Sequence, residues 1–166
     1  MTNVLSPKNL KILITLSLVL TTTLIYADQY TYKPSEKYTE HTLKQGEKWE
    51  TDEALRLAMD DIRNAFTASQ DDILKERLNT QAYERLAQVI DKNVAKIVKS
   101  SKLTQGADKA IHVVVISDLI GSSEFMHISS NVQAQRVGAL GTLQTLRNYG
   151  KYFQHTGWNL ETIKTK

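Results

Sequence analysis

Apolar residues recur at helical spacing in four stretches of the chain. The first stretch repeats every three or four positions through Leu55, Met59, Ile62 and Phe66. Such spacing places these side chains on one face of a helix. Thr51 precedes them as the expected N-cap, and Asp52 and Glu53 occupy the first turn, where the helix dipole favours acidic side chains. We therefore predict an amphipathic helix that begins at Thr51 and extends or resumes as far as Leu78.

The second and third stretches predict two further helices. After a break at Asn79-Thr80, the most regular repeat of the chain runs through Tyr83, Leu86, Ala87, Ile90, Val94, Ile97 and Val98. The third stretch, about 106–125, holds the β-branched run 111–116, which by residue preference alone fits a buried strand. We predict a helix, because the apolar stretch continues to Ile120 and no partner strand exists elsewhere. Being nearly continuously apolar, it is expected to be the most buried of the four helices.

The fourth helix is expected from about Asn131 to Phe153. Its inward positions are Val132, Ala139, Leu140, Leu143, Leu146 and Tyr149. Gly138, Gly141 and Gly150 lie within it and each cost about 1 kcal/mol relative to Ala. We interpret them as points of close helix packing, with space for a ligand as the alternative. Four amphipathic helices with short connections predict an all-α fold, an antiparallel four-helix bundle over residues 47–166.

Residues 1–27 have the pattern of a secretory signal peptide. Lys8 and Lys11 precede a 14-residue apolar run, 12–25, which is followed by Ala27 and a polar sequence. The run is shorter than the roughly 20 residues that a membrane-spanning helix needs. We therefore predict cleavage after Ala27 and a periplasmic location. Residues 28–46 are expected to form an extended tail that lies on the bundle through its tyrosines.

Charge and composition narrow the classes of function. The 166-residue chain has 21 Lys and Arg against 18 Asp and Glu, but loss of residues 1–27 removes two lysines and lowers the net charge from +3 to +1. We exclude nucleic acid as a partner, because no clustered excess of Lys and Arg remains. The absence of cysteine excludes thiolate sites. No nucleophile elbow or phosphate-binding glycine loop is present, so we predict that the protein is not an enzyme.

Candidate metal ligands are scattered along the predicted helices. His112 falls in the apolar face of the third helix, where a hydrogen-bonded core histidine is the alternative to a ligand. Glu124 and His127 have the Glu-x-x-His spacing of di-metal bundles, although such sites need two pairs. Met126 next to His127 offers the soft and imidazole ligands that suit copper in a protein without thiols. Copper or another divalent metal is therefore the candidate cofactor.

Met59 and His155 are a possible pair of haem ligands. A Met early in the first helix and a His late in the fourth resemble the haem site of cytochrome b562. However, Met59 lies about eight residues into its helix, roughly 12 Å from that end, and His155 lies at or past the end of the last helix. We therefore expect the two side chains to be offset by about two turns, and a haem electron carrier is the third hypothesis.

Two motifs carry a resemblance to a known family. The first is G-x-K-W-x-T-D followed by L-R-x-x-M-x-x-I-R, within residues 43–63, and the second is Y-G-x-Y-F-x-H-x-G-W over residues 149–158. Together they resemble a family of exported helical proteobacterial proteins, some labelled "DnrO protein". The resemblance implies export and helices but no established activity. Members typically carry a Cys where this chain has Ser101 and a Pro where it has Thr156, so any thiolate-dependent role is lost here.

The aromatic residues of these motifs are expected at one end of the bundle. Trp49, Tyr152 and Trp158 would lie there beside His155, either as a plug that closes the bundle or as the lining of a pocket. The first hypothesis is a non-catalytic small-ligand or metal-binding protein with its site at this end or at His112. The alternative is an accessory or stress-related protein that binds another protein and has no small-molecule site.

Overall fold

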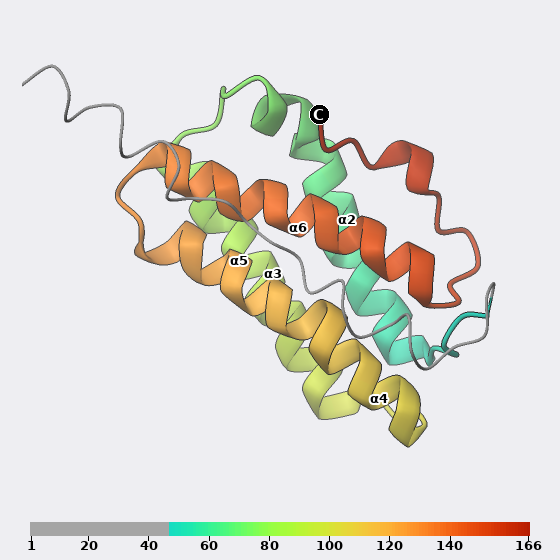
Figure 1. The fold of residues 1–166 in the computed structure, drawn as a ribbon. Helices are drawn as coiled ribbons and strands as arrows, with labels where there is room; N and C mark the ends of the chain where they lie inside the picture. Colours follow the sequence, from blue (N-terminus) through green and yellow to red (C-terminus); the bar gives the residue numbers. More distant parts are fainter. Residues whose placement is uncertain (1–46) are drawn as a thin grey trace, which may run out of the picture. The chain divides into compact units, whose positions relative to one another are not determined.

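The computed structural model describes residues 47–166, which form four long helices and no strand (Figure 1). Helix α2 spans Glu53–Leu74, α3 spans Thr80–Ser100, and α6 spans Val132–Tyr152. The helix between α3 and α6 has three consecutive parts: α4 (Gln105–Ile111), the π-helical turn η2 (His112–Ile116) and α5 (Ser117–Ile128). The predicted signal peptide, 1–27, and the predicted tail, 28–46, lie outside the described residues.

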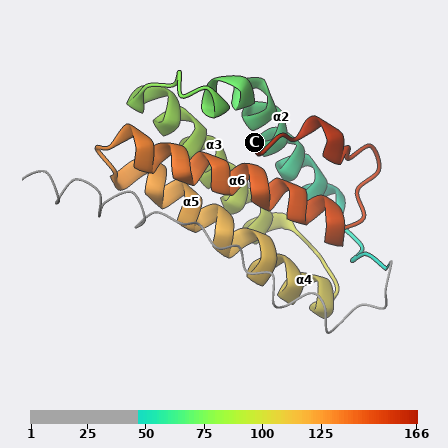
Figure 2. The ribbon, with the colours of Figure 1, turned by 45° about the horizontal axis from the view of Figure 1, so that its top comes forward.

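The helices pack in a ring of four. Helix α2 lies against α3 and α6, and α5 lies against the same two helices on their other sides (Figures 1 and 2). Consecutive helices run in opposite directions because the connections 75–79, 101–104 and 129–131 are short. The predicted all-α four-helix fold is confirmed.

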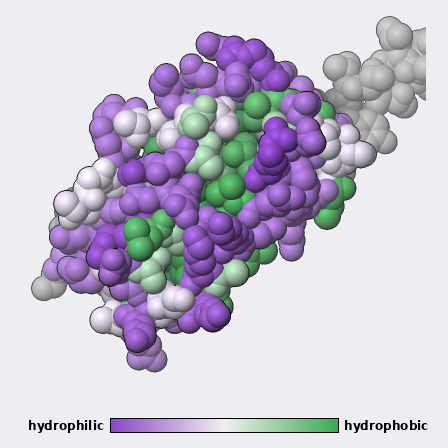
Figure 3. Space-filling model, turned by 180° about the vertical axis from the view of Figure 1, so that it is seen from behind, coloured by the Kyte–Doolittle hydropathy of each residue, from purple (hydrophilic) through white to green (hydrophobic). Residues whose placement is uncertain are grey.

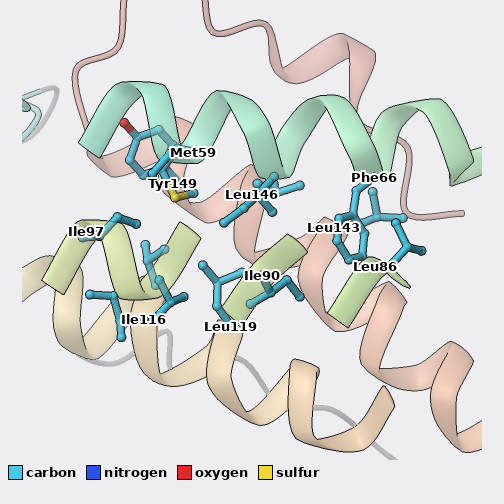
Figure 4. Packing of buried hydrophobic residues seen from close by; sticks show 14 of the residues in the cluster. Met59, Phe66, Leu86, Ile90, Ile97, Ile116, Leu119, Leu143, Leu146 and Tyr149 are labelled. Carbon is cyan, nitrogen blue, oxygen red and sulfur yellow. The ribbon is translucent and has the colours of Figure 1, made fainter. Parts of the chain in front are cut away.

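Apolar side chains from all four helices share one core (Figure 4). The predicted stripe of α2 is buried, and so are the inward positions Leu143, Leu146 and Tyr149 of α6. Two predicted inward positions are exceptions, because the Val98 side chain of α3 is 61% exposed and that of Val132 at the start of α6 is 36% exposed. Val98 lies at the edge of the α3 stripe, beside the buried Ile97.

Side chains cap the helices, and one predicted cap is wrong. Asn79 caps α3 by accepting a hydrogen bond from the Ala82 N–H, as the break in the pattern indicated. Helix α2 is capped by Asp52, which accepts the Leu55 N–H at 2.8 Å, and not by Thr51. Thr51 instead donates its hydroxyl to the Gln154 carbonyl, so a contact with the far end of the chain takes it away from the helix.

The β-branched run 111–116 is helical, as predicted, but its helix is not the most buried. Taken together, α4, η2 and α5 have fewer than half of their residues buried, whereas α6 has more than half buried. By length and apolar composition Gln105–Ile128 would also suffice to cross a membrane, although core helices of soluble proteins pass the same test. The prediction was wrong because α6 packs against α2 and α5 and is also covered in part by the C-terminal residues.

These C-terminal residues, 153–166, fold back against α2 and α6 and include the 3₁₀ turn η3 (Leu160–Thr162) (Figure 2). The Arg147 guanidinium on α6 donates to the carbonyls of Leu160 and Ile163 at 3.0 and 2.8 Å. The Lys164 N–H donates to the Gln70 side chain on α2. We call residues 153–166 the C-terminal segment. The sequence pattern did not predict this arrangement.

Candidate functional site

The two motifs of the family resemblance meet at one end of the bundle. Trp49 and Phe153 form an isolated parallel β-bridge, in which the Trp49 N–H donates to the Tyr152 carbonyl and the Gln154 N–H donates to the Trp49 carbonyl, each at 2.8 Å. The Lys48 ammonium donates to the Gly150 carbonyl at 2.6 Å. The chain before α2 is therefore fastened to the end of α6.

The two indoles cover two different glycines. The Trp49 ring lies on Gly106 at the start of α4, where an added Cβ would come within 2.7 Å of it. The Trp158 ring lies on Gly150 of α6, where an added Cβ would meet it at 2.5 Å. Neither indole N–H has a hydrogen-bond partner among the described residues, although both are buried. Close packing therefore holds both rings, which fits the plug interpretation of this end.

Trp158 is enclosed by further groups. Its ring meets the Tyr149 ring edge-on at 4.7 Å between centroids, and the Arg63 guanidinium lies 4.6 Å above it. Tyr149 also stacks on Phe153. Tyr152, the third residue predicted to line a pocket, is half-buried and supplies its carbonyl to the β-bridge. These contacts fill the end of the bundle with the protein's own side chains.

His155 is held inside this packing. Its side chain is 4% exposed, Nδ1 lies 3.1 Å from the Tyr149 hydroxyl, and Nε2 lies 3.3 Å from the Asp60 carboxylate. Burial lowers the pKa of His155; Asp60 opposes this effect and the Arg63 charge adds to it. Burial also raises the pKa of Tyr149. Both imidazole nitrogens are thus engaged, and a metal would have to displace Tyr149 or Asp60.

The expected offset between Met59 and His155 is wrong. The C-terminal segment folds back, so His155 lies level with Asp60, the residue that follows Met59. Met59 nevertheless points into the core and is fully buried (Figure 4), whereas Asp60 lies on the half-buried side of α2. The structure therefore brings Asp60, and not Met59, to His155.

His112 does not lie in the apolar face of its helix. Its side chain is about half exposed, and Nε2 lies 3.7 Å from the Asp108 carboxylate one turn earlier. The placement predicted for it was wrong because the π-helical turn shifts the register of the helix at this residue. It is therefore not a core residue.

His127 pairs with α3 and not with Glu124. Its Nδ1 lies 2.9 Å from the Glu84 carboxylate and its Nε2 lies 2.7 Å from Asp91. Asp91 also accepts the hydroxyl of Ser123 on α5. From the sequence, Asp91 was set aside as a metal ligand because it lies off the apolar stripe of its helix, and Glu84 was not considered. Their spacing of seven residues on α3 places them on one face. Among residues 47–166, no group of three or more His, Asp or Glu side chains is arranged to hold a metal ion.

Comparison of the chain with protein-family models, with curated proteins and with solved structures gives no match. The resemblance to the exported proteobacterial family therefore stays a prediction.

Proposed function

We propose that the mature protein is a non-catalytic, periplasmic binding protein that acts on another protein through the seam between α3 and α5. Two large apolar side chains support this proposal: Val98 on α3 is 61% exposed and Ile120 on α5 is 43% exposed. Exposed apolar patches of this kind mark contact sites when they are contiguous.

Val98 and Ile120 lie on the same side of the seam. The contact between Asp91 and His127 fixes how α3 and α5 align. Val98 lies seven residues after Asp91, and Ile120 lies seven residues before His127, so each shares a helix face with the residue that makes the contact. Because the two helices run in opposite directions, both steps lead the same way along the seam. We infer that the two exposed side chains belong to one elongated apolar patch along the seam.

The surroundings of the patch indicate the charge of the partner. Lys99 and Lys102 are exposed on the last turn of α3 and just beyond it, next to Val98. Helix α5 itself contains no Lys or Arg, which argues against a broad attachment to anionic lipid. Charge complementarity favours a protein partner with an apolar contact residue and an acidic rim.

Figure 3 shows the molecule from the side opposite to Figure 1. On that side, apolar areas reach the surface between hydrophilic ones.

The proposal is tested by photo-crosslinking in the periplasm. A benzophenone amino acid at position 98 or 120 is expected to capture one protein, identified by mass spectrometry, and Lys99→Glu with Lys102→Glu should reduce that capture at least several-fold. Position 57 is the matched control, because Leu57 is 60% exposed on α2, which does not border the seam. Equal capture at all three positions, or capture at none, would contradict a docking site here.

The competing small-ligand or metal hypothesis is tested on the same preparation. Native mass spectrometry and metal analysis of protein isolated from the periplasm are expected to give the bare mass of the mature chain. Stoichiometric copper, zinc, iron or haem would instead favour the metal hypothesis. In that case His155→Ala should abolish the metal if His155 is a ligand, and retention of the metal would exclude it.

A further inference from the structure

His127 is held between two carboxylates of the neighbouring helix. Glu84 contacts Nδ1 at 2.9 Å and Asp91 contacts Nε2 at 2.7 Å. A carboxylate accepts hydrogen bonds, so both ring nitrogens satisfy these contacts only when both carry a proton. The geometry is therefore that of a charged imidazolium. A neutral ring would direct one lone pair at a carboxylate oxygen.

The charged groups around His127 all favour its protonated form. From α3, Glu84 and Asp91 face it, and on its own helix Glu124 precedes it by one turn. The first charged side chain of α6, Arg136, donates to the carbonyls of Ile73 and Leu74 on α2 and not to the groups around His127. The Asp91 hydrogen bond raises the pKa of His127 most; burial opposes it, and Glu84 raises the pKa further.

We propose that His127, Glu84 and Asp91 form a proton-dependent clasp that fastens the last turn of α5 to α3 and loosens when the imidazole loses its proton. The position suits such a device, because His127 is the second-last residue of α5 and the connection 129–131 follows at once. A positive charge there also complements the negative end of the helix dipole. This inference does not depend on the partner proposed above, because it concerns α5 itself.

The clasp is placed to affect the exposed side of α5 rather than the whole fold. Within the last turn, Met126 is buried in the core, whereas the next residue but one, Ile128, is 83% exposed. Release of His127 would thus leave Met126 in place and free the end of the turn. The expected response to rising pH is local opening at residues 124–131, with the rest of the bundle unchanged.

The first test is the titration of His127 by NMR in the folded mature protein, between pH 5.5 and 9. We expect its pKa to lie above that of the same imidazole in the urea-unfolded chain, where the ordinary value is about 6.5. The shift should diminish in about 1 M salt, because the three side chains are partly exposed. It should also diminish in Asp91→Asn. A folded-state pKa at or below the unfolded value would overturn the proposal.

The second test is hydrogen exchange, corrected for the intrinsic pH dependence of amide exchange. In the wild type, protection of amides 124–131 should fall at least several-fold as pH rises through the titration of His127. In His127→Gln this dependence should be absent. His112→Gln is the matched control, because it removes an exposed imidazole from the same helix and should keep the wild-type profile. An identical profile in wild type and His127→Gln would refute the clasp even if the NMR shift were found.

Discussion

At the scale of single residues, two helical glycines differ in how closely other residues pack against them. A Cβ on Gly138 of α6 would lie 2.6 Å from the Ser122 carbonyl oxygen of α5 and 3.1 Å from Met126. A Cβ on Gly121 of α5 would meet nothing within 4 Å. The sequence predicted close packing at Gly138, and the structure agrees. It predicted the same at Gly150, where the neighbour is Trp158 of the C-terminal segment and not a helix.

We expect Gly138→Ala to lower the free energy of unfolding by about 1–3 kcal/mol, because backbone of α5 must move to admit the methyl group. Gly121→Ala should raise it by up to about 1 kcal/mol, since Ala favours the helix and the space is open. Urea unfolding followed by circular dichroism measures both changes. A neutral Gly138→Ala would show that α5 and α6 are not in close contact at this point.

At the scale of helices, Asp52 joins the start of α2 to the end of α3. One carboxylate oxygen caps α2 at the Leu55 N–H, and the other accepts the Ser101 hydroxyl and the Lys102 N–H. Burial alone would raise the pKa of Asp52, but these hydrogen bonds and the Arg56 charge hold it below its ordinary value. The Ser101 hydroxyl thus helps to hold the end of α3 against the start of α2.

Asp52→Ala is expected to cost about 1–2 kcal/mol of unfolding free energy, because it removes a cap and leaves the α3 terminus without its acceptor. Thr51→Ala, at the cap predicted from sequence, should cost less, about 0.5 kcal/mol, since it loses only the hydroxyl's hydrogen bonds with the Gln154 carbonyl and the Arg56 guanidinium and no helix cap. Parallel urea titrations compare the two variants. Equal losses would mean that Asp52 does not cap α2 in solution.

The π-helical turn η2 is a second feature of this scale. The Ser117 N–H donates to the His112 carbonyl, five residues back, so the turn holds one residue more than an α-helical turn. Sequence periodicity indicated a helix here, yet it could not locate the extra residue. The turn exposes His112 and still buries Val114, Val115 and Ile116.

Deletion of His112 should therefore be tolerated, with a loss of at most about 1–2 kcal/mol, because the turn can close into regular α-helix while both flanking faces stay inward. Deletion of Lys92, an exposed residue in regular α3, should cost several kcal/mol, since every later residue of α3 turns by about 100°. Thermal unfolding distinguishes the two. Comparable losses would argue against an accommodating π turn.

At the scale of the molecule, two histidines give opposite pH dependences of stability. The lowered pKa of His155 means that the folded state resists protonation there, so stability falls as pH drops below the unfolded pKa of about 6.5. The raised pKa of His127 stabilises the fold below about pH 6.5, and this stabilisation is lost as pH rises through the folded pKa. Stability is therefore lost on both sides of about pH 6.5, through His155 below it and through His127 above it.

Between pH 5 and 9, the free energy of unfolding is therefore expected to pass through a maximum near pH 6.5. His155→Gln should flatten the acidic limb and leave the alkaline limb, whereas His127→Gln should do the reverse. Urea unfolding at half-unit pH steps resolves the limbs. If His155→Gln is too unstable to measure, the alkaline limb in the wild type and its loss in His127→Gln still test half of the prediction.

The sequence by itself determined the helices, because a repeat of three or four apolar positions depends only on which side of each helix faces a core. It also placed the Asn79 cap and most of the inward side of α6, with the exception of the exposed Val132. Only the tertiary structure decided which side chains meet between elements. His155 reaches Asp60 and His127 reaches Glu84 and Asp91 because the C-terminal segment folds back and α5 lies along α3. Those contacts depend on the path of the C-terminal segment and on the alignment of neighbouring helices. Neither can be read from the spacing of residues along a single helix.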